Sequence, residues 1–137
     1  DEFASFGVLI RKKMRAAFEK VIMRVKLSSN RLLSKVGTLS GGNQQKVVMA
    51  KCLLKSPKLL LLDEPSRGVD VIARKEIYES ILAASKEGMS IILVSSDINE
   101  VIEYSDRILV LAAGRNLGIL SRGDADLEKI LSMKFDA

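Results

Sequence analysis

The sequence lacks most of the features that mark secreted or membrane-spanning proteins. Its 137 residues include a single cysteine, Cys52, which cannot form an internal disulfide. No stretch resembles a secretory signal, so a reducing, cytoplasmic setting is the expectation. The apolar runs are broken by charged residues and fall short of the roughly 20 residues needed to span a bilayer. These absences favour one globular domain over a disulfide scaffold or a membrane span.

Aromatic residues are also scarce, at 4% of the chain, whereas basic residues exceed acidic ones and give a net charge of +5. Much of the excess lies in "RKKMRAAFEKVIMRVK", and such a basic stripe can contact nucleic acid or an anionic membrane. However, apolar residues repeat there at helical spacing, at Ile10, Met14, Phe18, Val21 and Val25. Because few rings are available to stack on single-stranded bases, the pattern favours a helix with a solvated basic face.

The hydrophobic pattern predicts helices that alternate with strands. The runs "KLLLLDEP" and "MSIILVSS" are short and apolar, which is typical of parallel strands buried on both faces. The stretch "DRILVLAAGRNLGIL" predicts a strand, a glycine-containing turn and an antiparallel return strand. Helices are expected over residues 8–27, 41–54, 71–85, 98–105 and 124–136. This alternation indicates the α/β class.

Two adjacent carboxylates, Asp63 and Glu64, follow the first predicted strand. Open α/β folds bind ligands at the carboxyl ends of their strands. An aspartate there can hold Mg²⁺ directly or through water, and a glutamate can orient or deprotonate a water that attacks a phosphate. A strand that simply ends in polar residues and a turn explains the same letters equally well.

The stretch "VGTLSGGNQQK" is a second candidate site. A helix N-terminus has unpaired N–H groups and a partial positive charge, and the two glycines after Ser40 let the backbone approach a phosphate. Serine and glycine are equally good N-cap residues without any ligand. Gly37 and Gly42 have P-loop spacing, but Asn43 and Gln44 stand where a P-loop needs Lys and Ser or Thr. The stretch is therefore not a Walker A motif.

Taken together, in this order and spacing, the stretches resemble motifs of the ATP-binding cassette (ABC) ATPases. "LSGGNQQK" is similar to the family's signature motif, and "LLLLDEPSRGVD" is similar to its Walker B motif and D-loop. "IILVSSDINEVIEYSDRILVLAAGR" resembles the switch segment and the strand after it. The details "SGGNQQK" and "EPSRGVDV" are most similar to the second ATPase domain of subunits that energise ribose, galactose and xylose importers.

The resemblance is close over residues 32–120 and looser over the N-terminal helix. It implies the C-terminal half of a P-loop ABC ATPase cassette, with a helical subdomain segment at about residues 1–38 and the motifs and a C-terminal helix at 39–137. The family's Walker A motif, first strands and Q-loop glutamine would precede this chain. Because a truncated sheet exposes an apolar edge, the isolated fragment is expected to self-associate, to bind ATP weakly and to be inactive.

In this family two cassettes face each other head to tail and hold ATP between them. The resemblance implies that Ser40, Gly41 and Gly42 contact ATP bound to the other cassette. Gln44 follows the signature and is a further candidate for ATP binding. Asp70 would lie at the interface between the cassettes, and its alternative role is to cap the helix that follows it.

The carboxylates would serve the nucleotide bound to this cassette itself. The resemblance implies that Asp63 is a Mg²⁺ ligand, that Glu64 is the catalytic base, and that Ser96 occupies the place of the family's switch histidine. The chain contains no histidine. A serine donates a hydrogen bond but carries no positive charge against a developing phosphate charge. Slow or no hydrolysis is therefore expected here, while the sister site, which uses this chain's signature, remains active.

The resemblance also implies cofactors, partners and a location. These are ATP and Mg²⁺, a second ATPase cassette, transmembrane permease subunits and, indirectly, a sugar-binding protein, at the cytoplasmic face of the cell membrane. Two alternatives stay open: a soluble ABC ATPase that acts on nucleic acid through the basic helix, and a catalytically degenerate regulatory half. No long heptad arm and no interleaved aromatics are present, so no nucleic-acid partner is expected. The retained Glu64 argues against a complete loss of chemistry.

Overall fold

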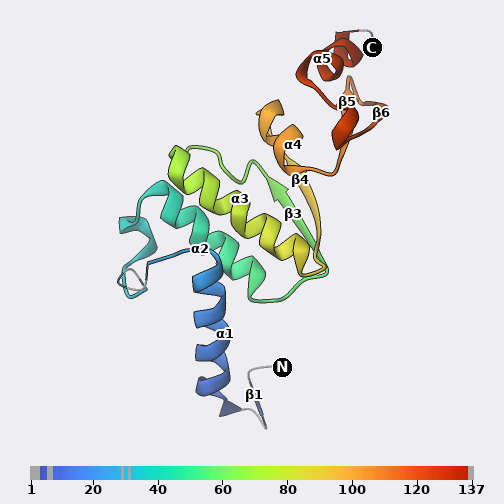
Figure 1. Ribbon diagram of the computed structural model, residues 1–137. Helices are drawn as coiled ribbons and strands as arrows, with labels where there is room; N and C mark the ends of the chain where they lie inside the picture. Colours follow the sequence, from blue (N-terminus) through green and yellow to red (C-terminus); the bar gives the residue numbers. More distant parts are fainter. Residues whose placement is uncertain (1–3, 6–7, 29, 31, 136–137) are drawn as a thin grey trace. The chain divides into compact units, whose positions relative to one another are not determined.

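The structure, a computed structural model, describes residues 4–5, 8–28, 30 and 32–135 (Figure 1). The chain divides into two compact units. Unit 1 comprises Asp1–Leu60 and Pro65–Ile91, and unit 2 comprises Leu61–Glu64 and Ile92–Ala137. The helices and strands alternate as the α/β class predicts.

The three long helices of unit 1 are α1 (Arg11–Arg24), α2 (Gly41–Leu53) and α3 (Val71–Lys86). A 3₁₀ turn, η2 (Val36–Thr38), precedes α2. The bounds of α2 and α3 confirm the prediction, but the prediction for the first helix is wrong at its start. Two short antiparallel strands, β1 (Ala4–Ser5) and β2 (Val8–Leu9), come before it. Backbone pairing therefore replaces the first expected turn of helix.

The core of unit 1 is formed where α1, α2 and α3 meet. Val21 and Val25 of the predicted apolar stripe are buried, whereas Met14 and Phe18 remain 44% and 37% exposed. The basic residues of α1 up to Lys20 face solvent, as the stripe predicts for a solvated face, whereas the side chain of Arg24 is only 15% exposed. The second half of α1 packs into unit 1 together with apolar residues of the other two helices, including Met49, Leu53, Ile77, Tyr78 and Ile81. The predicted boundary of a helical subdomain at about residue 38 stays a prediction.

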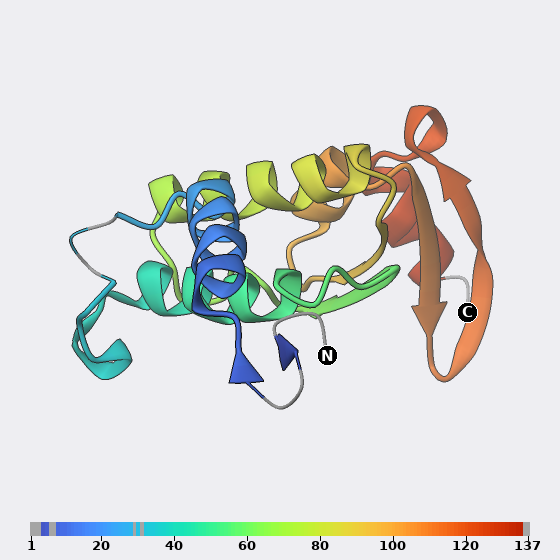
Figure 2. The same cartoon turned by 90° about the horizontal axis from the view of Figure 1, so that it is seen from below.

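Helices α2 and α3 lie side by side and run in the same direction (Figure 1 and Figure 2). Gly42 and Ala73 touch near the first turns, and Lys46 and Glu76 are ion-paired one turn further along each helix. Both helices therefore begin at the same end of unit 1. This places the residues at the start of α2 next to those at the start of α3.

Polar contacts fasten the C-terminal end of α1 to α3. Arg24 is ion-paired with Glu87, and Lys26 Nζ lies 2.6 Å from Glu79 Oε2. The hydroxyl of Ser80 donates to the main-chain carbonyl of Arg24 at 2.9 Å. The bond from Ser80 satisfies one of the main-chain carbonyls that the end of a helix leaves unpaired.

The strands that lead to the carboxylates are β3 (Leu59–Asp63) and β4 (Ser90–Val94), which are neighbours in a two-stranded sheet. Within unit 1, Ser90 N–H donates to the Lys58 carbonyl, and within unit 2, Glu64 N–H donates to the Val94 carbonyl, each at 2.9 Å. The pairing advances along both strands in the same sense, so the strands are parallel.

The prediction that these strands are buried on both faces is wrong for this chain. Alternate side chains are exposed, and Leu61, Ile92 and Val94 show 67%, 53% and 54% of their surface. A strand is buried on both faces only when further layers cover both sides of its sheet. Within the described residues, β3 and β4 pair only with each other.

Unit 2 contains the predicted hairpin, β5 (Arg107–Ala112) and β6 (Arg115–Ser121), which pair in antiparallel fashion. The two turn residues, Ala113 and Gly114, have φ angles of 49° and 74°. Both positive angles are typical of the tight turns that match the twist of hairpin strands. The hairpin packs with α4 (Ile98–Tyr104) and α5 (Leu127–Phe135) around Ile108, Val110, Leu120 and Ile130.

Among the described residues, every helix is too short or too polar to span a bilayer.

Candidate functional site

The residues predicted from the motifs fall into two groups, each inside one unit. Ser40, Gly41, Gly42, Gln44 and Asp70 lie in unit 1. Asp63, Glu64 and Ser96 lie in unit 2.

Ser40 occupies the N-cap position of α2 in an extended conformation, with φ −60° and ψ 155°. Its side chain is exposed and makes no capping hydrogen bond to the described residues of the helix. Its main-chain carbonyl accepts the N–H of Gln44 at 2.9 Å, which is the first turn of the helix. The backbone alone therefore starts α2, and the Ser40 hydroxyl is left facing solvent beside the first N–H groups.

Gln44 directs its side chain toward the chain that enters the helix. Its Nε2 donates to the main-chain carbonyl of Leu39 at 2.9 Å. This bond stabilises the connection between the 3₁₀ turn and α2. Gln44 is half-buried, and its predicted role in ATP binding stays a prediction.

The two glycines of the signature lie in different environments. Gly41 is exposed, and a Cβ on it would lie 3.4 Å from the carbonyl of Gly68. Gly42 is buried, and a Cβ there would lie 2.4 Å from the Cβ of Ala73 on α3. Real Cβ atoms do not approach so closely, so only glycine lets α2 come this near to α3. The close packing of α2 against α3 is therefore sufficient to explain why position 42 is glycine.

Asp70 caps α3, as its alternative role predicts. Its Oδ1 accepts the N–H of Ala73 at 2.9 Å, which satisfies one of the unpaired donors of the first turn. Its Oδ2 would lie 3.8 Å from a Cβ on Gly42. The capping carboxylate is therefore adjacent to the start of α2, at the end of unit 1 where Ser40 and Gly41 also lie.

In unit 2, Asp63 is the last residue of β3 and is exposed. Glu64 follows it in the left-handed backbone region, with φ 49°. A non-glycine residue adopts this region at a cost of order 1–3 kcal/mol, and such residues cluster at active sites.

Ser96 contacts the Glu64 carboxylate through two groups. Its main-chain N–H donates to Oε1 at 2.7 Å, and its hydroxyl donates to Oε2 at 3.2 Å. The structure therefore brings together the predicted base and the residue at the switch position. Each oxygen of the carboxylate accepts one hydrogen bond from the same residue.

Motif reasoning missed two residues that support Ser96. The hydroxyl of Ser95 donates to Oε2 of the buried Glu100 at 2.8 Å and accepts the N–H of Asp97 at 3.1 Å. Asp97 in turn caps α4 by accepting the N–H of Asn99 at 3.0 Å. These bonds hold the segment between β4 and α4 in one conformation. The sequence did not single out Ser95 or Glu100, because the burial of Glu100 in the first turn of α4 is visible only in the structure.

The carboxylate pair fits part of a Mg²⁺ site. Mg²⁺ is usually bound through one or two protein carboxylates, with phosphate oxygens and waters completing its shell. Asp63 offers one exposed carboxylate, while Glu64 accepts hydrogen bonds from Ser96. No group of three acidic, histidine or cysteine side chains in the described part of the chain could hold the ion alone. The donor set therefore suits an ion that arrives with a nucleotide.

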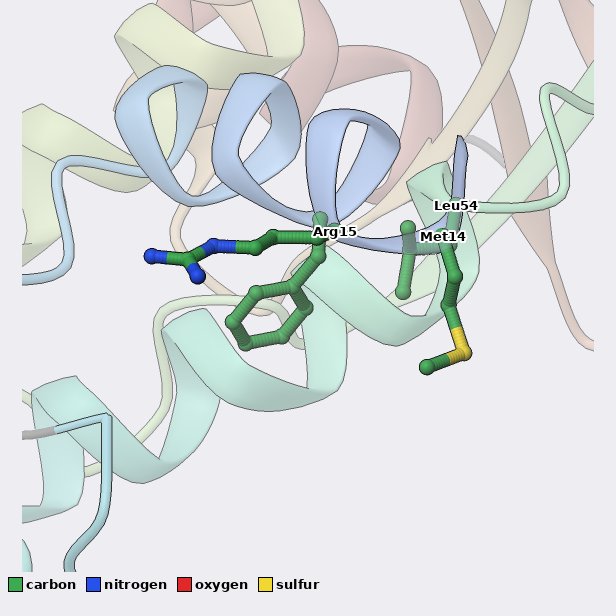
Figure 3. A pocket seen from close by; sticks show the side chains of 4 residues that line it. Met14, Arg15 and Leu54 are labelled. Carbon is green, nitrogen blue, oxygen red and sulfur yellow. The ribbon is translucent and has the colours of Figure 1, made fainter. Parts of the chain in front are cut away.

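A hollow of about 500 Å³ lies along the exposed half of α1 (Figure 3). It is lined by Met14, Arg15, Phe18 and Leu54, the last of which follows the end of α2. None of the predicted site residues lines it. Apart from Arg15, the residues that line the hollow are apolar.

The comparisons with known proteins agree with these observations. A family described as "ABC transporter" matches residues 3–67. A xylose import ATP-binding protein, XylG from Geobacillus kaustophilus, is 51% identical over 114 residues, which are 83% of this chain and 23% of that protein. A ribose import ATP-binding protein, RbsA from Streptococcus agalactiae, is 45% identical over 132 residues, or 96% of this chain and 27% of that protein.

Solved structures show the same fold. The cbiO1 protein from Clostridium perfringens, part of the ABC transporter complex cbiONQ, is 28% identical with a TM-score of 0.78. The match covers 90% of this chain and 49% of that one. A dimeric bacterial ABC transporter cassette matches with a TM-score of 0.74 and 24% identity, over 86% of this chain and 51% of that cassette.

The chain has the fold of about half of one ABC ATPase cassette, and its residues 3–67 match the ABC transporter family. Its similarity to import proteins for ribose and xylose agrees with the details of the signature and D-loop. The chain spans about a quarter of the length of these curated relatives.

Proposed function

We propose that the protein to which this chain belongs is the ATP-hydrolysing subunit of a sugar ABC importer. The observation that carries the proposal is the identity of 45–51% with ribose and xylose import ATP-binding proteins over 83–96% of the chain. The grouping of the motif residues at the helix ends of unit 1 and at the end of β3 supports it. These relatives favour the importer over the ATPase that acts on nucleic acid.

In this proposal, the N-terminal end of α2 contacts the γ-phosphate of ATP held by a second cassette. Ser40 and Gly41 are exposed at that end, where N–H groups and the helix dipole attract an anion. Gly42 contributes by letting α2 pack against α3. Asp70, next to them, completes the surface that faces the second cassette.

The carboxylates serve the nucleotide of this cassette itself. Asp63 holds Mg²⁺ directly or through water, and Glu64 orients or deprotonates the attacking water. Each oxygen of Glu64 accepts one hydrogen bond from Ser96 and keeps a second lone pair that can accept a proton from the water. Because Ser96 brings no positive charge, this site hydrolyses ATP slowly, and the sister site supplies most of the turnover.

The proposal also assigns partners and a location. Sugar import requires permease subunits that cross the membrane and a sugar-binding protein that delivers the cargo. The ATPase subunit acts at the cytoplasmic face of the membrane, with ATP and Mg²⁺ as cofactors and a second cassette as its dimer partner. The degenerate regulatory half is disfavoured by the pairing of Glu64 with Ser96, which keeps the base at the end of β3.

The unequal contribution of the two sites provides the test. In the intact subunit assembled with its permease, Ser40→Arg should abolish most ATP hydrolysis and transport, because it blocks the active sister site. Glu64→Gln should have a much smaller effect, because it disables the slow site. Equal losses of ATPase activity from the two substitutions would contradict this assignment.

A further inference from the structure

We propose that Lys46 is a positioning residue, whose buried ammonium group holds the N-terminal end of α2 in place beside that of α3. The inference rests on the proposed function, since Ser40 and Gly41 at that end are the proposed ATP contacts. Lys46 lies more than a turn away from them and would touch no nucleotide itself. Its action is on the orientation of the helix.

Lys46 has been removed from water almost completely, with only 5% of its surface exposed. Its Nζ donates to the carboxylate of Glu76 on α3 and, at 3.3 Å, to the main-chain carbonyl of Lys26. Burying an ammonium group is unfavourable unless it is paired and hydrogen-bonded. Lys51, on the same helix, is exposed and shows that α2 has room for solvated lysines. The burial of Lys46 therefore reflects a specific contact and not a general need for charge on α2.

The ion pair between Lys46 and Glu76 lies one helical turn beyond the contact of the signature glycine, Gly42, with α3. Gly42 meets Ala73 at the start of the helix pair, and Lys46 meets Glu76 one turn later on each helix. The glycine contact limits how far apart the helices lie. The ion pair determines their register along the axis, because a charge-assisted hydrogen bond is directional whereas apolar contact is not.

The same ammonium group also reaches the end of α1. Lys26 follows that helix in the left-handed conformation, with φ 52°, and its carbonyl accepts from Lys46. One buried side chain therefore joins the first, second and third helices of unit 1. Its contacts with Lys26 and Glu76 therefore position α2, which carries Ser40 at its N-terminal end, against α1 and α3.

The test uses the intact ATPase subunit assembled with its permease. Lys46→Met leaves the carboxylate of Glu76, whose side chain is 29% exposed, without its partner and is expected to lower the melting temperature. Lys46→Met combined with Glu76→Leu removes both charges, fills the same space, and is expected to restore the wild-type melting temperature. Lys51→Met is the matched control, because it removes an exposed charge from the same helix.

If Lys46 positions the signature, the double variant keeps the KM for ATP but loses kcat by about tenfold or more, because small misplacements of reacting groups have effects of this size. Lys46→Arg, which keeps the charge, recovers most of kcat. A double variant with both the melting temperature and the kcat of the wild type would overturn the proposal, since the pair would then be purely structural.

Ser40→Arg separates this inference from the function on which it rests. If Ser40→Arg leaves the ATPase rate at the wild-type level, the proposed ATP contact is itself wrong, and the role of Lys46 falls with it. If Ser40→Arg abolishes hydrolysis while the double variant keeps its full kcat, the ATP contact stands and only the positioning role is overturned.

Discussion

Ser96 binds both carboxylate oxygens of Glu64, with its N–H 2.7 Å from Oε1 and its hydroxyl 3.2 Å from Oε2. Glu64 makes this contact from the left-handed backbone region, with φ 49°, immediately after the last residue of β3. The serine at the place of the family's switch histidine is thus bonded to the proposed base.

Replacing Ser96 by histidine is expected to raise the rate of ATP hydrolysis at this cassette's own site. A protonated imidazole carries a positive charge toward the developing phosphate charge, which a hydroxyl cannot do. The substitution is made in a Ser40→Arg subunit, in which the sister site is blocked, and phosphate release is measured. An increase of about tenfold or more is expected.

Asn99→His is the control for that experiment, because Asn99 is exposed on α4 and contacts neither carboxylate oxygen of Glu64. It adds a histidine to the same segment without placing it at the switch position. An unchanged rate in Ser96→His, or an equal rise in Asn99→His, would contradict the importance of the missing charge.

Gly42→Ala is expected to destabilise the protein by about 1–3 kcal/mol, because its methyl group would collide with the Cβ of Ala73. Ala73→Gly removes that Cβ, so the double substitution should recover part of the lost free energy of unfolding. The recovery is reduced by about 1 kcal/mol, because glycine within a helix is less favourable than alanine. Urea unfolding of the four proteins in this cycle measures the coupling. Gly41→Ala is the matched control, since its Cβ meets only an ordinary contact at 3.4 Å. Additive effects of Gly42→Ala and Ala73→Gly would contradict direct contact.

The ion pairs between α1 and α3 predict a loss of stability in acid. The hydrogen bond from Lys26 lowers the pKa of Glu79 below 4.5, and the hydrogen bond from Arg24 likewise lowers the pKa of Glu87. A carboxylate with a depressed pKa stabilises the folded state above its unfolded pKa, and this contribution disappears as the pH falls through the folded pKa. The benefit is therefore present at neutral pH and lost on the acid side of 4.5.

Glu79→Gln and Glu87→Gln should accordingly lower the urea midpoint at about pH 6.5. The deficit should be smaller at about pH 3, because the benefit of a depressed pKa declines as the pH falls on the acid side of 4.5. Glu103→Gln, on the exposed surface of α4, is the control, and it should lower the midpoint at neither pH. A deficit of equal size at both pH values would show that the ion pairs do not control the pH dependence.

The isolated chain is expected to self-associate and to bind ATP weakly. The apolar residues Leu61, Ile92 and Val94 are exposed on β3 and β4, as expected for a sheet of only two strands that has no further strands or layers to cover it. Ile92→Lys should reduce association in size-exclusion chromatography with light scattering, whereas Val48→Lys, at an equally exposed site on α2, should not. A clean monomer, or micromolar binding of ATP in titration calorimetry, would contradict this expectation.

The sequence by itself determined the local structure and the family of this chain. The start of α2, the bounds of α3 and the hairpin around Ala113-Gly114 follow from periodicity and from residues that cap or turn the chain within a few positions. The motifs are also contiguous, so their order along the chain was enough to indicate an ABC cassette. Burial of β3 and β4 was predicted wrongly, because burial depends on which layers cover a strand and not on its own letters.

Only the tertiary structure decided which of these residues act together. Lys46 and Glu76 are 30 positions apart, Glu64 and Ser96 are 32 apart, and both pairs form because separate elements pack against each other. No local pattern shows that Gly42 faces Ala73, or that Lys46 is buried on the same side of α2. Periodicity assigns a side chain to a face of its own helix, whereas the partner on that face is chosen by helix packing and by the need to pair each buried charge.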